Sequence, residues 1–171
     1  DAIIIINVET KKEQKITFDL DGIFSVEWSH DGSKLAFVGL KTPQTDIYVY
    51  DLKSKELTNV TNDIFTDSDP FFSYDNKTIY FTSDRGIYTS PSLLPRNFKI
   101  ANYDYGQMDI YSLDIETKNI NRVLDLPRSA ESTPRPSPDG KKLLFVSDIN
   151  GIANFYIYDF DEKNYYPITN S

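Results

Sequence analysis

The side chains that could perform acid–base catalysis are few and poorly placed for it. His30 is the only histidine among the 171 residues, and the sequence contains no cysteine. A catalytic histidine needs a nucleophile on one side and an orienting carboxylate on the other, whereas His30 lies in Ser29-His30-Asp31-Gly32, which is typical of a tight turn. The G-x-S-x-G motif that presents a catalytic serine in α/β-hydrolases is absent from the sequence. We therefore predict that the protein is not an enzyme and has no catalytic residues.

Carboxylates outnumber basic side chains by 26 to 18, which gives a net charge of −8. This charge disfavours nucleic acid as a partner, because such binding depends on Lys and Arg against phosphate. Asp67 and Asp69 flank Ser68 in a spacing of oxygens that calcium could use, but the glycine-bearing EF-hand pattern is absent and we favour solvated turns. We predict neither a metal nor a cofactor. The acidic segments between the expected strands instead favour a basic partner.

A turn motif that occurs three times identifies the elements that position these groups. Each copy begins with a serine, carries an aspartate two residues later, and has a phenylalanine eight residues after the serine. The copies are Ser29-His30-Asp31-Gly32, Ser73-Tyr74-Asp75-Asn76 and Ser137-Pro138-Asp139-Gly140, and their phenylalanines are Phe37, Phe81 and Phe145. Gly, and less readily Asn, tolerates the positive φ that such a hairpin turn needs. Short apolar and aromatic runs follow each turn and predict strands.

Repeats of about 44 residues with four short strands are typical of a β-propeller. We predict an all-β fold, a partial β-propeller of about three and a half four-stranded antiparallel blades from a larger ring. A half blade would span residues 1–18 and full blades 23–62, 68–126 and 132–171, with innermost strands near 23–28, 68–73 and 132–137. The last sheet would have a bare apolar face, so we expect the remaining propeller blades or self-association to cover it. No run reaches the roughly 18 apolar residues of a membrane helix, so we expect no membrane insertion.

An insert at residues 86–107 distinguishes the second blade from its two sister copies, which close the corresponding hairpin without it. Inserts on one face of a repeat protein often form its binding surface, and loops of this length are usually functional. Because Tyr, Phe and Arg dominate interface energetics, we predict a docking site for a protein or peptide. The predicted site comprises Tyr88, Arg96, Phe98, Tyr103 and Tyr105 of the insert, the nearby Asp67 and Asp69, and Arg135 facing the central channel.

The alternative interpretation is that the insert only packs against its own blade. The two interpretations differ in what they predict for stability. A docking loop can be shortened with little effect on stability, because long surface loops add little closure cost, whereas a packed hairpin extension cannot.

Residues 28–37 resemble the W-S-P-D-G-x-x-I-A-F core of TolB-like (WD40-like) β-propeller repeats, and residues 137–148 match it more closely. His30 and Tyr74 occupy positions where that family prefers proline, and Asn76 one where it prefers glycine. The resemblance implies a non-enzymatic propeller that binds proteins or peptides in the periplasm or extracellular envelope of a bacterium. Two alternatives stay open, since one fold serves many functions. One is an accessory, gating propeller of a prolyl-oligopeptidase-type hydrolase whose catalytic domain lies outside this chain; the other is a glycan-binding propeller.

Overall fold

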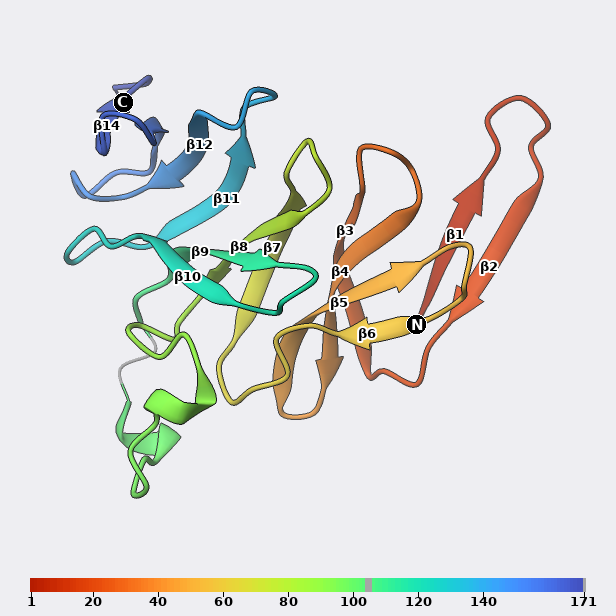
Figure 1. Ribbon diagram of the computed structural model, residues 1–171, viewed down its shortest axis with the longest axis horizontal. Coiled ribbons are helices and arrows are strands. Elements are labelled where there is room, and N and C mark those ends of the chain that lie inside the picture. The colour runs from red at the N-terminus through yellow and green to blue at the C-terminus, as the bar shows by residue number, and fades with distance from the viewer. Residues whose placement is uncertain (104–105, 171) are drawn as a thin grey trace.

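The computed structural model describes residues 1–103 and 106–170, and consists almost entirely of antiparallel β-sheets. Figure 1 shows these sheets side by side in a fan that runs from an N-terminal hairpin to β14. The hairpin pairs β1 (Ala2–Ile6) with β2 (Glu13–Thr17). The first full blade comprises β3 (Gly22–Trp28), β4 (Lys34–Lys41), β5 (Gln44–Asp51) and β6 (Leu57–Asn59). The second comprises β7 (Asp67–Phe72), β8 (Thr78–Ser83), β9 (Asp109–Asp114) and β10 (Ile120–Leu124). The third comprises β11 (Glu131–Pro136), β12 (Lys142–Ser147), β13 (Asn154–Asp159) and β14 (Asn164–Pro167).

These sheets confirm the predicted all-β partial propeller. The insert lies between β8 and β9 and contains two short 3₁₀ turns, η1 (Pro91–Leu93) and η2 (Ile100–Asn102). It projects from the second blade at the lower left of Figure 1. Among the described residues, no helix has the length and apolar character that crossing a bilayer requires.

The recurring turn closes the first hairpin of each blade with the same hydrogen bonds. Ser29 Oγ donates to Asp31 Oδ1 over 2.7 Å and accepts from the backbone N–H of Lys34 over 2.8 Å. The serine-to-aspartate bonds of the other two copies, at Ser73 and Ser137, are both 2.6 Å long. Gly32 has a φ of +70°, the conformation for which the glycine of this turn is needed. The repeated sequence is therefore a repeated hydrogen-bonded turn.

A β-bulge bends the innermost strand of every full blade at one repeated position. Ser25, Asp69 and Thr133 have φ values of 49°, 50° and 50°, and the pairing register shifts beside each. A bulge of this kind bends its strand and increases the local twist. Asp69 Oδ2 also accepts the backbone N–H of Thr133 over 3.2 Å, which ties the bulge of the second blade to that of the third.

The hydrophobic core lies between neighbouring sheets. Phe37, Phe81 and Phe145, the phenylalanines of the three repeats, are fully buried. Phe81 belongs to the cluster between the first and second blades, and Phe145 to the cluster between the second and third. Strand β7 contacts both β3 and β11, which places the innermost strands next to one another.

Both ends of the fan expose apolar side chains. Ile4 and Ile6 of the N-terminal hairpin and Phe155 and Ile168 of the third blade are about half exposed. Their exposure is in keeping with the expected cover by further blades or by another copy of the chain, which stays a prediction.

Candidate functional site

A buried arginine joins the link between the first two blades to the second blade. Arg85 follows β8 and is only 1% exposed. Its Nη1 donates to Asp63 Oδ2 over 2.8 Å, its Nη2 to Asp67 Oδ1 over 2.6 Å, and its Nε to Ser83 Oγ over 3.0 Å. Strand register explains this geometry, because Asp67 at the start of β7 lies opposite Ser83 at the end of β8. A long side chain just beyond Ser83 can therefore reach back to Asp67.

Three aromatic rings surround the Arg85 guanidinium. Its central carbon lies 5.2 Å from the ring centroid of Phe81, 5.5 Å from that of Tyr111 and 5.8 Å from that of Phe65. The guanidinium is planar, weakly hydrated and attracted to aromatic faces. These properties explain why an arginine can be buried at this position, where a lysine ammonium would lose more hydration.

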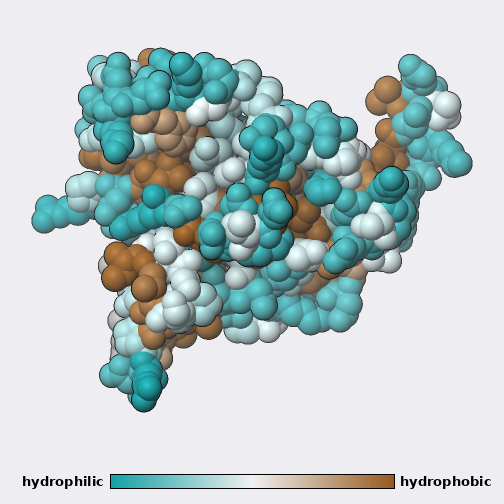
Figure 2. All heavy atoms as spheres, in the orientation of Figure 1, coloured by the Kyte–Doolittle hydropathy of each residue, from teal (hydrophilic) through white to brown (hydrophobic). Residues whose placement is uncertain are grey.

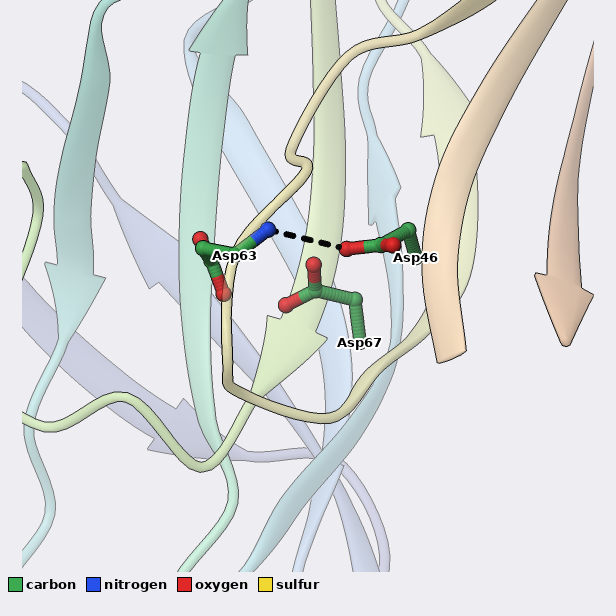
Figure 3. Close-up of side chains that lie close together, drawn as sticks. All are labelled: Asp46, Asp63 and Asp67. Atoms are coloured by element: carbon green, nitrogen blue, oxygen red, sulfur yellow. Dashed lines mark hydrogen bonds between the residues drawn. The ribbon is translucent and has the colours of Figure 1, made fainter. Parts of the chain in front are cut away.

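Asp46, Asp63 and Asp67 have carboxylate oxygens within 4.8 Å of one another (Figure 3). Such oxygen clusters suit hard cations, but Arg85 already pairs with two of the three carboxylates. The backbone N–H of Asp63 also donates to Asp46 Oδ1 over 3.2 Å, the dashed line of Figure 3. Burial raises the pKa of Asp67, an effect that Arg85 opposes and Asp63 reinforces. We interpret the cluster as an ion-pair network that holds the link against the blade.

The aromatic side chains of the insert pack on the link residue Phe65. The Phe65 ring centroid lies 5.7 Å from that of Tyr103, 5.9 Å from that of Tyr88 and 6.0 Å from that of Phe98. The three insert rings also contact one another, with centroids 5.2 to 5.8 Å apart. The hydroxyl of Tyr103 lies over Gly86, where any Cβ would clash with it. We call Phe65 and these three rings the aromatic cluster; it shields Phe65, which in turn covers Arg85.

The other residues of the predicted docking site lie in different surroundings. Arg96 is exposed on the insert, and Tyr105 lies outside the described residues. Arg135 forms an ion pair of 3.2 Å with Glu27 and lies 4.2 Å from the ring centroid of Phe71. Asp67 and Asp69, the pair considered for calcium, bind Arg85 and the backbone of Thr133. The structure therefore brings Tyr88, Phe98 and Tyr103 together, while a binding role for any of these residues stays a prediction.

His30 is part of a contact between turns. Its ring stacks on that of Tyr74 with centroids 3.9 Å apart, and Nε2 lies 3.3 Å from the carbonyl oxygen of Phe72. Both contacts cross from the first blade to the second. They give His30 a packing role at this boundary.

A pocket of about 430 Å³ opens between the insert, the β4–β5 hairpin and the link before β7. Its apolar wall includes Pro43, Ile64, Ile100 and Met108, and among the described lining residues the carboxylate of Asp84 is the charged group. Asp84 is 5% exposed and accepts the backbone N–H of Thr66 over 2.9 Å. Burial raises its pKa, which the hydrogen bonds from Thr66 oppose.

Reasoning from the sequence missed Arg85, Asp46 and Asp84. A signal for Arg85 is present in the repeats. Asp67 and Glu131 are the first residues of equivalent strands, and Ser83 and Ser147 lie opposite them. An acid and a serine repeated at these positions indicate a geometry that recurs in both blades and into which Arg85 fits. Asp84 carries a comparable signal, because Ser83-Asp84 recurs as Ser147-Asp148, but the repeat does not show that the insert buries Asp84.

The comparisons with known proteins agree with the repeated turn and the blade geometry. A family model described as the TolB beta propeller domain matches residues 1–90, so the chain belongs to the TolB β-propeller family. The structure of TolB from Acinetobacter baumannii has a TM-score of 0.76 with 25% identity, covering 99% of this chain and 38% of that one. The putative TolB from Agrobacterium tumefaciens has a TM-score of 0.71 with 23% identity, covering 98% of this chain and 60% of that one.

A curated relative, an uncharacterised protein of Agrobacterium fabrum, is 29% identical over 120 residues. The match covers 70% of this chain and 34% of that protein, so this chain corresponds to about a third of its length. The structure of puromycin hydrolase shares the fold with a TM-score of 0.68 at 10% identity, over 95% of this chain and 24% of that one. TolB proteins and a hydrolase thus share the blade arrangement seen here.

Proposed function

We propose that this TolB-like propeller is a non-enzymatic scaffold that binds a protein or peptide at the face carrying the insert. The observation that carries this proposal is an insert that is packed and yet exposes apolar side chains. Ile87 is 70% exposed and Leu93 is 52% exposed, while the aromatic cluster holds the same segment against Phe65. Figure 2 shows apolar side chains gathered over this region at its lower left. Contiguous exposed apolar surface favours a protein interface.

Packing of the insert favours binding because it lowers the conformational entropy that is lost when a partner binds. A loop that is already ordered loses little conformational freedom when a partner docks. Arg96 is exposed on the same segment and supplies a polar contact of the type enriched at interfaces. The aromatic residues thus shape the insert, and the exposed aliphatic residues and Arg96 contact the partner.

Membership of the TolB family supports a location in the periplasm or extracellular envelope of a bacterium and a protein as the partner. The alternative of an accessory hydrolase propeller draws on the fold shared with puromycin hydrolase. The hydrolase alternative would be favoured if the sequence flanking this chain contained an α/β segment with a nucleophile elbow. The glycan-binding alternative needs exposed aromatic platforms, whereas Tyr88 and Tyr103 pack against each other at an interplanar angle of 58° within the aromatic cluster. We therefore favour the glycan-binding alternative least.

The test is a selection of random peptides displayed on phage against the protein, followed by affinity measurements on the enriched peptides. We expect the double variant Ile87→Ser/Leu93→Ser to weaken their binding at least about tenfold, because the apolar contact is lost. Ile152→Ser is the matched control, since Ile152 is 53% exposed in the corresponding connection of the third blade. Peptides that bind the double variant as tightly as the native protein would move the site away from the insert.

A further inference from the structure

The pocket beside the insert combines two features that are seldom found together. Four of its lining residues, Pro43, Ile64, Ile100 and Met108, are apolar. Among the described residues that line it, Asp84 is the one carboxylate, and its Oδ1 is held in place by the backbone N–H of Thr66. Among the ion pairs formed within residues 1–103 and 106–170, none includes Asp84. A nearly buried carboxylate without a paired cation is costly, and an incoming cation would relieve that cost.

The third blade shows what the insert changes. Asp148 occupies the repeat position of Asp84, and its Oδ1 accepts the backbone N–H of Ala130 over 2.9 Å, the same bond that Asp84 accepts from Thr66. Asp148 is nevertheless exposed to solvent, because the third blade has only a short connection where the second has the insert. The hydrogen bond therefore explains the aspartate as a structural residue in both blades, but not the apolar pocket built around Asp84.

We propose that this pocket receives the side chain of a lysine or arginine from the partner, an inference that rests on the proposed function. The aliphatic part of the side chain contacts Ile64, Ile100 and Met108, and its charged end pairs with Asp84. Lys and Arg commonly bury their stems along apolar surface in this way. The net charge of −8 attracts a basic segment to this protein. A volume of about 430 Å³ leaves room beside the basic side chain for an apolar neighbour.

Met108 is a direct reporter for this proposal, because it lines the pocket and is the only methionine in the sequence. Protein labelled with ¹³C at the methionine methyl group is titrated with butylguanidinium, and separately with the uncharged butanol. We expect a saturable shift of the single methionine resonance with butylguanidinium, with millimolar affinity, and at least about tenfold weaker binding of butanol. Asp84→Asn should reduce the affinity for the cation to that for butanol, while its Oδ1 can still accept the Thr66 N–H and preserve the fold.

Asp148→Asn is the matched control, because it removes the same charge and keeps the same backbone hydrogen bond. It should leave the titration unchanged. Equal affinity for butanol and butylguanidinium, or no effect of Asp84→Asn, overturns the proposal. The peptides selected on the native protein provide a second measurement: they should contain a basic residue and lose affinity for Asp84→Asn. Peptides that lose affinity for Ile87→Ser/Leu93→Ser but not for Asp84→Asn would overturn this inference and leave the proposed function standing.

Discussion

The second and third blades place an acid at the same buried position and stabilise it in different ways. Asp67 and Glu131 both open the innermost strand of their blade, opposite a serine. Asp67 pairs with Arg85, whereas the third blade has Ile149 at the repeat position of that arginine. The same backbone thus holds an ion pair in one blade and, in the next, an acid that forms no ion pair with any described residue.

The third blade replaces the cation with hydroxyl groups. Glu131 Oε1 accepts from Ser129 Oγ over 2.6 Å and from Ser147 Oγ over 3.1 Å. Ser129 occupies the repeat position of Phe65, the ring that covers Arg85 in the second blade. Burial raises the pKa of Glu131 to about 7, although both serines oppose the shift. The third blade therefore lacks both the arginine and the aromatic ring that covers it, and the pKa of its buried acid lies near neutral pH.

The largest effect is expected for Arg85→Met, which removes the cation from the second blade. Asp63 and Asp67 are then left buried without a counterion, and breaking a buried pair in this way costs about 3–5 kcal/mol. Urea unfolding at pH 8 measures the loss. Arg122→Met is the control, because Arg122 is more exposed than Arg85 where it pairs with Asp109 and should cost less. Equal losses for the two variants would show that the buried Arg85 network stabilises the protein no more than the more exposed pair of Arg122 with Asp109.

Glu131→Gln tests the other half of the comparison and should stabilise the protein. The pKa of Glu131 in the folded protein is about 7, above its ordinary value of 4.5. Between these two pH values the folded state keeps a proton that the unfolded state has lost, so the stability of the fold falls as the pH rises from 4.5 to about 7. The amide removes this penalty, with a gain on the order of 1–3 kcal/mol at pH 8 and less than half as much at pH 5. Urea unfolding at the two pH values measures both gains. Asp67→Asn, at the equivalent position, also removes a carboxylate whose pKa burial raises. It leaves the buried Arg85 with one partner fewer, however, and we expect this loss to dominate and to destabilise the protein at pH 8. The same sign for both variants would contradict the comparison.

Ile149→Arg gives the third blade an arginine at the repeat position of Arg85. Phe145 and Tyr156 are buried there at the repeat positions of Phe81 and Tyr111, so two of the three aromatic faces around Arg85 are already present. A guanidinium near Glu131 should lower the pKa of that carboxyl. We expect the fall in stability between pH 5 and pH 8 to become smaller by about 1 kcal/mol or more, relative to the native protein. An unchanged pH dependence would mean that the arginine does not reach Glu131.

The propeller could be predicted because turn and strand residues recur at fixed spacing, so that each copy of the repeat is independent support for the assignment of strands in the others. The Asp67–Arg85 pair was not predictable in the same way, since it depends on the cross-strand register that places Asp67 opposite Ser83. The insert lies between β8 and β9, but its sequence does not show that Tyr88 and Phe98 pack on Phe65. Because that packing covers Phe65, we now expect shortening of the insert to cost stability, unlike the expectation for a free docking loop.

The smallest effect is expected for Ser129→Ala, which removes one of the two hydroxyl groups that bind Glu131. A hydrogen bond to a charged group contributes about 1.5–3 kcal/mol and one to a neutral group about 0.5–1.5 kcal/mol. The ionised carboxylate at pH 8 therefore loses more than the protonated acid at pH 5, and we expect a cost of about 1–2 kcal/mol at pH 8 that falls to half or less at pH 5. Urea unfolding at the two pH values measures the difference, and the exposed Ser92, replaced by alanine, provides the control.

This variant also resolves an ambiguity in the third blade. Ser129 Oγ lies 3.0 Å from the carbonyl oxygen of Leu126 as well as 2.6 Å from Glu131 Oε1, and a hydroxyl has one proton to donate. A cost that is the same at pH 5 and pH 8 would assign that proton to Leu126, whose carbonyl does not titrate. Glu131 would then depend on Ser147 alone, and the hydroxyl groups of the third blade would not be the counterpart of Arg85. A cost that grows with pH would assign the proton to Glu131, as the shorter distance indicates.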